Sequence, residues 1–300
     1  MKLLFVVNPI SGGVDKEPFL IEARALCINY GVKYEIFKTT GTNDEAEVQK
    51  AIDAFKPTRV VSIGGDGTTL FTAIALLNLN IPMGIIPLGS ANGMAVELSV
   101  NLNPLEALKD ILMSNVIEGL DMLLINDKHY TMHIGDVGLN ASIVEAYEKD
   151  ENRGMATYAK YFIEALKTLS PFKVTVNANG KTVSSHVLMT AICNARKYGT
   201  GVPLNKLSNP MDGQFEIVLI EEVNFTSLIK AGLSKFDEQF MDDQSGQVIA
   251  TESAEIIFDK PRLLQLDGEV IDFYKEIKIE MLKGAVQLIS TKSNTYISAK

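Results

Sequence analysis

The sequence predicts an α/β protein in which a domain with a parallel sheet is followed by a domain of antiparallel strands. Over the first 120 residues, apolar runs alternate with helical patterns. The texture then changes to short strand-like runs separated by Gly, Asn and Pro. Residues 67–96 carry no charge, which is typical of a helix and a strand in a sheet covered on both faces. The length of 300 residues, 46% of them hydrophobic, suits two domains.

The first domain is expected to span residues 1–121, and about 286–300 are expected to return to it. Its strands are predicted from short apolar runs, and its helices from apolar residues at helical spacing. The expected strands are Lys2–Val7, Val32–Lys38, Arg59–Ile63 and Met83–Pro87. The expected helices are Glu17–Tyr30, Asp44–Phe55, Thr68–Leu77 and Pro104–Met113.

The second domain is expected over residues 122–285 and is predicted to be an antiparallel sandwich or barrel. Its expected strands are Thr131–Ile134, Phe172–Val176, Val187–Cys193, Phe215–Ile220, Ala254–Phe258, Leu263–Leu266 and Ile277–Met281. Two helical patterns interrupt them, at about 155–169 and 225–236.

Composition narrows the classes of function. The net charge of −9 makes nucleic acid an unexpected partner, because binding to phosphates needs a basic face. Cys27 and Cys193 are far apart and form no metal-binding or disulfide pattern. The apolar run at the start is too short for a signal peptide, and Asn and Pro interrupt residues 67–96, so neither segment predicts a membrane helix. We expect a cytoplasmic protein.

The strongest motif is a strand that ends in Gly64-Gly65-Asp66-Gly67-Thr68 before a helix begins. Glycines let the backbone approach a ligand closely, and a helix N-terminus favours an anion such as phosphate. Asp66 would repel a bare phosphate, so it favours a nucleotide with Mg²⁺. The structural alternative is a tight turn in which Asp66 is a helix cap.

Two further polar loops follow strands of the same predicted sheet. They are Asn8-Pro9-Ile10-Ser11-Gly12-Gly13 and Pro87-Leu88-Gly89-Ser90-Ala91-Asn92-Gly93. The carboxyl ends of parallel strands meet at one edge, so we expect the three loops to converge on one ligand.

Other polar residues are ambiguous when taken singly. Asp267-Gly268-Glu269 is either a hairpin turn or a source of a general base, and Asp212-Gly213 has the same ambiguity. His129, His133 and His186 show no catalytic spacing, and His133 is expected to be a satisfied structural histidine.

Taken together, these motifs resemble the diacylglycerol kinase catalytic-domain family, which includes bacterial lipid kinases and the sphingosine and ceramide kinases. The resemblance spans essentially the whole chain. It depends on the three loops, Gly135-x-x-Gly138, Asp212-Gly213 and Asp267-Gly268-Glu269, which occur in the family's order.

The resemblance implies a nucleotide-binding α/β domain, a β-sandwich domain for the lipid, and an ATP cleft between them. The activity it implies is Mg²⁺-dependent transfer of the γ-phosphate of ATP to the hydroxyl of a diacylglycerol-like lipid. Asp267 would be the general base, and Glu269 would act on the nucleotide or Mg²⁺ side. The implied ATP-site residues are Asn8, Ser11, Gly12, Thr40, Gly64, Gly65, Asp66, Gly67, Thr68, Gly89, Ser90 and Asn92.

The resemblance also implies a structural divalent ion at Asp212, with backbone carbonyls near Leu207 and Gln214. Three positions depart from the family's pattern. Met211 stands where some relatives carry an acid, which leaves fewer oxygen ligands for the ion. Gly93 and Asn140 stand where relatives often have Asp, and a neutral Asn140 disfavours the amino headgroup of a sphingoid base.

Two other interpretations stay open. One is a soluble kinase similar to NAD kinase, which shares the Gly-Gly-Asp-Gly strand end. The other is a non-catalytic module of the same fold that binds lipid or nucleotide. A lipid substrate predicts transient, peripheral contact with a membrane surface. The sequence does not reveal the oligomeric state, and a homodimer stays open.

Overall fold

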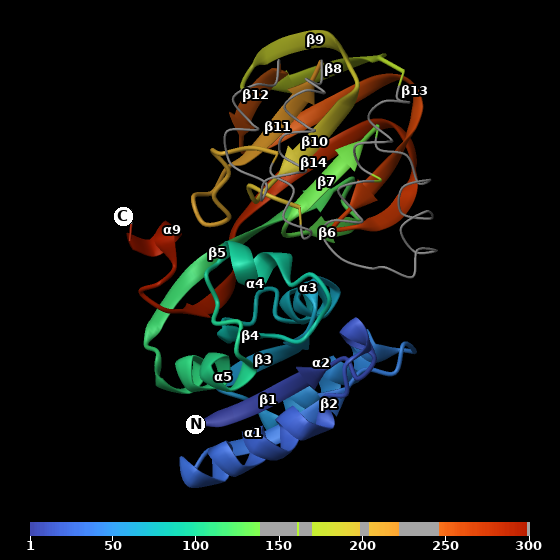
Figure 1. Ribbon diagram of the computed structural model, residues 1–300. Coiled ribbons are helices and arrows are strands. Elements are labelled where there is room, and N and C mark those ends of the chain that lie inside the picture. Colours follow the sequence, from blue (N-terminus) through green and yellow to red (C-terminus); the bar gives the residue numbers. More distant parts are fainter. Residues whose placement is uncertain (139–160, 162–169, 199–203, 222–245, 299–300) are drawn as a thin grey trace. The chain divides into compact units, whose positions relative to one another are not determined.

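The computed structural model describes the chain except for residues 139–160, 162–169, 199–203, 222–245 and 299–300 (Figure 1). The chain forms two compact units. Unit 1 comprises Met1–Leu120 and the chain from Gly284 onward, and unit 2 comprises Asp121–Lys283. The two helices expected at about 155–169 and 225–236 fall outside the described residues, as does Asn140.

Unit 1 contains a parallel sheet whose strands come from alternating β and α elements. Its strands are β1 (Lys2–Val7), β2 (Lys33–Lys38), β3 (Arg59–Gly64) and β4 (Met83–Pro87). They lie in the order β2-β1-β3-β4, and every pairing is parallel. The order of the strands changes direction between β1 and β3, which makes this edge a topological switch point, where ligands of such sheets bind.

Helices cover both faces of this sheet. The helices are α1 (Glu17–Asn29), α2 (Asp44–Phe55), α3 (Asp66–Ala75), α4 (Gly93–Glu97) and α5 (Pro104–Met113). One core joins Leu3, Phe5 and Val7 of β1 to the buried sides of α1 and α5. Helix α2 instead contacts α3 and β1. Coverage of both faces explains why 67–96 lacks charge.

The end of the chain completes unit 1. The last strand, β14 (Glu269–Ser290), pairs in parallel with β4 through Leu288 and Met83. The short helix α9 (Thr295–Ser298) follows, and the Tyr296 hydroxyl donates to the buried carboxylate of Glu97. Among the described helices, none is long and apolar enough to cross a bilayer.

Unit 2 contains antiparallel strands. They are β6 (His129–Thr131), β7 (Ile134–Val137), β8 (Phe172–Ala178), β9 (Lys181–Val187), β10 (Met189–Cys193), β11 (Phe215–Ile220), β12 (Gly246–Thr251) and β13 (Ser253–Leu266). The strand β5 (Val116–Ile125) leads into this unit and pairs with β6. One path of neighbours is β12-β11-β10-β7-β13, and β13 also pairs with β8 and β14. Apolar residues of β7, β8, β10, β11, β13 and β14 form one core.

The fold class predicted from the sequence is therefore confirmed, with three local corrections. The expected strand Thr131–Ile134 is wrong, because it is interrupted at Met132–His133. The expected strand Val187–Cys193 is interrupted at Leu188. The runs 254–258 and 263–266 belong to the single strand β13, which contains a register irregularity between Ile257 and Arg262. The interruption at Met132–His133 results from hydrogen bonds to the Asp267 carboxylate.

Candidate functional site: three glycine loops and a held carboxylate

Three loops of unit 1 pack against one another through glycine backbones. A Cβ atom on Gly89 would lie 2.2 Å from the Cα of Gly65, and one on Gly12 would lie 2.9 Å from the carbonyl carbon of Gly89. Gly12 also has φ +63°, which favours glycine. The loops expected to converge therefore lie in direct contact, at the carboxyl ends of β1, β3 and β4.

Polar side chains fix the same three loops. The Ser11 hydroxyl donates to Leu88 O at 3.4 Å and to Asn8 O at 3.3 Å. The Asn92 side chain accepts from Gly89 N at 2.8 Å and donates to Gly89 O at 3.0 Å. Ser90, between them, is exposed. The Ser11 bond joins the first loop to the third, and the two Asn92 bonds fix the shape of the third loop.

Asp66 links its loop to the helix that follows the third loop. One carboxylate oxygen accepts from Gly93 N and the other from Met94 N, each at 2.9 Å. Asp66 is therefore a helix cap, but of α4 rather than of α3, the helix that it begins. Gly93 contributes its backbone amide to this link.

Thr68 has a buried hydroxyl with no hydrogen-bond partner among the described residues. It lies at the start of α3, and a Cβ on Gly64 would come within 2.2 Å of its oxygen. A buried hydroxyl without a partner is unfavourable, so this atom is suited to a polar group of a ligand. Glycine at position 64 leaves the space that the Thr68 hydroxyl occupies.

A cavity of about 450 Å³ opens beside these loops within unit 1. Its size lies in the range of small-molecule sites. The residues that line it are Asn8, Pro9, Ile10, Thr39, Thr40, Gly41, Asp44, Gly67, Thr68 and Phe71. The lining thus includes four of the predicted nucleotide-site residues, one of which is Thr68 with its unsatisfied hydroxyl.

Asp44 shapes one wall of that cavity. Its carboxylate accepts from Thr40 N at 2.9 Å, from the Thr40 hydroxyl at 3.0 Å and from Gly41 N at 2.7 Å. The bond from Thr40 N, followed by those from Gly41 N and the Thr40 hydroxyl, lowers the pKa of Asp44. Asp44 therefore stays ionised and fixes the turn that carries Thr40.

Lys16 is a residue of this site that sequence reasoning missed. Its side chain is buried, and its ammonium donates to Ser11 O and, at 2.7 Å, to Val14 O. Burial lowers the pKa of Lys16, and the charge of Asp15 opposes this shift. Lys16 thus places a positive charge directly beneath the Ser11–Gly13 turn. No motif in the sequence distinguishes it from a surface lysine.

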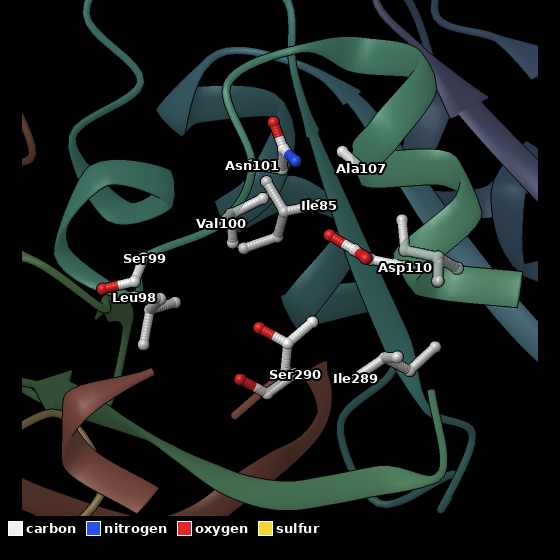
Figure 2. Close-up of a pocket in the computed structure, with 11 residues that line it drawn as sticks. Ile85, Leu98, Ser99, Val100, Asn101, Ala107, Asp110, Ile289 and Ser290 are labelled. Carbon is white, nitrogen blue, oxygen red and sulfur yellow. The ribbon is translucent and has the colours of Figure 1, made fainter. Parts of the chain in front are cut away.

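A second cavity of unit 1, shown in Figure 2, is too small to be the ligand site. Its volume is about 20 Å³, which is room for about one water molecule. Asp110 of α5 lies at its wall, where burial, followed by the charge of Glu106, raises the pKa of the Asp110 carboxyl.

In unit 2, Asp267 and Gly268 form the two-residue turn between β13 and β14. Both have positive φ, +50° and +91°, and Leu266 pairs with Glu269 across the turn. This geometry belongs to the type I′ hairpin that Asp-Gly favours. Glu269 is exposed at the start of β14. The turn interpretation is confirmed, and the Asp267 side chain has further contacts.

The Asp267 carboxylate accepts three hydrogen bonds from Thr131–Ile134, which runs from the last residue of β6 to the first of β7. The Thr131 hydroxyl donates to Oδ1 at 2.6 Å, Ile134 N donates to Oδ1 at 3.2 Å, and Met132 N lies 3.4 Å from Oδ2. These bonds explain why the expected strand Thr131–Ile134 is interrupted, since amides that would pair in a ladder turn toward the carboxylate instead.

Burial raises the pKa of Asp267, while the charge of His133 and the three hydrogen bonds oppose that shift. A carboxylate with a raised pKa accepts a proton more readily, as a general base must. His133 is buried, and its Nε2 atom has no partner among the described residues, so the structure does not confirm the expectation of a satisfied structural histidine.

The residues predicted to hold a divalent ion do not form an obvious cage. Asp212 is exposed and accepts from Gln214 N at 3.0 Å, and Leu207 is also exposed. The described part of the chain contains no group of three His, Cys, Asp or Glu side chains suited to a metal. The nearby Gly213 N donates to the buried carboxylate of Asp121 at 2.7 Å.

Known protein families share this combination of fold and loops. Residues 2–125 match the family described as diacylglycerol kinase catalytic domain, and residues 135–290 match the YegS C-terminal NAD kinase beta sandwich-like domain. Together the two matches cover most of the chain, which belongs to the diacylglycerol kinase catalytic-domain family.

Several relatives cover most of the chain. A diacylglycerol kinase of Bacillus subtilis is 21% identical over 93% of this chain and 95% of its own. A Yersinia enterocolitica protein described as a probable lipid kinase YegS-like is 29% identical, over 86% of this chain and 87% of its own.

Solved structures share the fold. A Bacillus anthracis diacylglycerol kinase superposes with a TM-score of 0.73 at 20% identity, covering 98% of each chain. An Archaeoglobus fulgidus NAD kinase in complex with ATP superposes with a TM-score of 0.59 at 16% identity, covering 98% of this chain and 95% of its own.

Proposed function

We propose that this protein is a lipid kinase that transfers the γ-phosphate of ATP to the hydroxyl of a diacylglycerol-like lipid. The observation that carries the proposal is the Asp267 carboxylate, which the Thr131 hydroxyl and two backbone amides hold at a hairpin tip. Membership of a kinase family and the glycine loops of unit 1 supply its context.

The loops of unit 1 fit the triphosphate of a nucleotide. Glycines allow its close approach, the start of α3 offers backbone amides, and the Thr68 hydroxyl lacks a protein partner. The Lys16 ammonium beneath the first loop adds a positive charge. In the adjacent cavity, Ile10 and Phe71 provide apolar walls that suit the adenine ring of ATP.

Mg²⁺ is proposed to accompany ATP, because phosphoryl transfer needs neutralisation of charge on the phosphate oxygens. The described residues do not favour a dedicated protein cage for this ion, since both oxygens of Asp66 bind backbone amides. The structural ion at Asp212, Leu207 and Gln214 remains a proposal of the family resemblance. Its test is the metal content of the purified protein.

The chemical step then requires little covalent help from the protein. The lipid hydroxyl attacks the γ-phosphorus in line, the new O–P bond forms, and the bond to the bridging oxygen breaks as ADP leaves. Asp267 accepts the hydroxyl proton. Glu269, exposed two residues later, is proposed to act on the nucleotide side.

A lipid acceptor is favoured over a soluble one by two exposed apolar side chains that follow Asp267. Val270 is 43% and Phe273 is 64% exposed, and the register irregularity between them lets both face outward from β14. We propose transient contact with a lipid surface at this hairpin, at a cytoplasmic membrane face. The fold shared with an NAD kinase keeps NAD as the second candidate acceptor.

The test is transfer of labelled γ-phosphate from ATP, with and without Mg²⁺, to diacylglycerol and other lipids in mixed micelles. NAD serves as the soluble acceptor. Asp267→Asn should lower kcat by roughly 10²–10⁴-fold. The matched control, Asp272→Asn, removes an exposed carboxylate of β14, the strand that follows the Asp267 turn, and should retain activity. Labelled NADP would refute the lipid acceptor, and ATP binding without transfer to any acceptor would indicate a non-catalytic module.

A further inference from the structure

Thr131 and Asp267 are 136 residues apart and meet through the pairing of β7 with β13. The ladder runs from Leu264 opposite Val137 to Leu266 opposite Gly135, and it continues through the bond from Asp267 N to Ile134 O at 2.9 Å. This register places the turn residue Asp267 against the segment between β6 and β7. The position of its carboxylate is therefore set by two strands as well as by the turn.

The donors divide unequally between the two carboxylate oxygens. Among the residues that the structure describes, Oδ1 has the short bond from Thr131 and the bond from Ile134 N, whereas Oδ2 has only the long contact with Met132 N at 3.4 Å. A contact of that length is at the limit of a hydrogen bond. Oδ2 therefore keeps an acceptor position that the described residues do not fill well.

The orientation of the Thr131 hydroxyl is fixed by its surroundings. Its side chain is fully buried, and its hydroxyl oxygen also faces His133 N at 3.4 Å. A β-branched side chain has few rotamers, so burial fixes the direction of its hydroxyl. That hydroxyl has one proton, and the proton is directed to Asp267.

We propose that Thr131 is a positioning residue for the phosphoryl transfer, which holds Oδ1 of Asp267 so that Oδ2 is the oxygen presented to the acceptor hydroxyl. The inference rests on the proposed function. In the step, the hydroxyl proton passes to Oδ2 while the acceptor oxygen forms its bond to the γ-phosphorus and ADP departs. A general base whose oxygen is displaced by about 1 Å from the acceptor hydroxyl loses much of its catalytic effect.

The test compares Thr131→Val, which keeps the shape and removes the hydroxyl, with Thr131→Ser, which restores it. Thr190→Val is the matched control, because Thr190 is equally buried in unit 2 and its hydroxyl has no partner among the described residues. Thr131→Val should lower kcat by at least about tenfold, with the KM values for ATP and lipid nearly unchanged. Thr131→Ser should recover most of that loss, and Thr190→Val should behave as the wild type.

Crystal structures of the same variants give a readout that needs no kinase activity. In Thr131→Val the Asp267 carboxylate should leave its present orientation, and in Thr131→Ser it should keep it. An unmoved carboxylate in Thr131→Val, or a kcat equal to that of Thr190→Val, would overturn the proposal. If the wild type transfers phosphate to no acceptor, the proposed function fails, and the orientation of the carboxylate alone decides the role of Thr131.

Discussion

Gly89→Ala is expected to separate the loops that form the nucleotide site. The added Cβ would lie 2.2 Å from the Cα of Gly65, whereas non-bonded carbons rest at about 3.5 Å, so the backbones must part by roughly 1.3 Å. Both partners are backbone atoms and cannot rotate away. Overpacking of this kind costs about 1–3 kcal/mol, and we expect a loss of unfolding free energy near 3 kcal/mol.

The assay is urea denaturation together with calorimetric titration of ATP. Gly67→Ala is the matched control, since a Cβ at Gly67 meets no atom within 4 Å and this position lies in the first turn of α3. We expect the control to keep its stability and Gly89→Ala to lose at least about tenfold in ATP affinity, or about 1.4 kcal/mol. Gly67 lines the cavity, so Gly67→Ala controls for stability alone, and the wild type is the reference for ATP affinity. Equal stability of the two variants, or an ATP affinity of Gly89→Ala equal to that of the wild type, would refute the contact of the loops.

Three further outcomes are expected. Asp66→Asn should lower the unfolding free energy by roughly 1–3 kcal/mol, because an amide cannot accept from both Gly93 N and Met94 N; urea denaturation measures it, and an unchanged midpoint would contradict the cap. Lys16→Met should weaken ATP binding more than adenosine binding, and equal losses for the two ligands would argue against a role of its charge. Burial raises the pKa of Asp110 in the folded state, so its contribution to stability falls as pH rises from the unfolded value through the folded one. Asp110→Asn should therefore gain stability relative to the wild type between pH 4 and pH 7, and parallel pH curves from urea denaturation would show that the carboxyl is not perturbed.

The sequence predicts the first domain well because its signals are local. The predicted bounds of β1, α2, β4 and α5 agree with the structure, since each has a continuous apolar run or a helical period and clear end signals. Convergence of the three loops follows from the rule for parallel strands, which needs no knowledge of register. Helix α4 was not predicted, because its five residues are too few to show a period.

The contacts of the site depend on partners that are remote in the chain. Asp66 and Gly93 are 27 residues apart, and Thr131 and Asp267 are 136 apart, so no spacing rule connects them. Their meeting depends on the register of strand pairs and on the course of a loop. The same long-range contact also explains the error at Thr131–Ile134, where apolar composition favours one strand and the carboxylate of Asp267 divides it in two.

The two aspartates of the glycine motifs, Asp66 and Asp267, differ in whether a carboxylate oxygen is available to accept a proton. In Asp66 each oxygen accepts from a backbone amide at 2.9 Å, so a proton added there would break a bond that holds α4. In Asp267 the bonds are concentrated on Oδ1, and Oδ2 can accept a proton while Thr131 and Ile134 keep their partner. Burial also raises the pKa of Asp267. The hydrogen-bond geometry therefore favours Asp267 as the base and gives Asp66 the task of joining the loops.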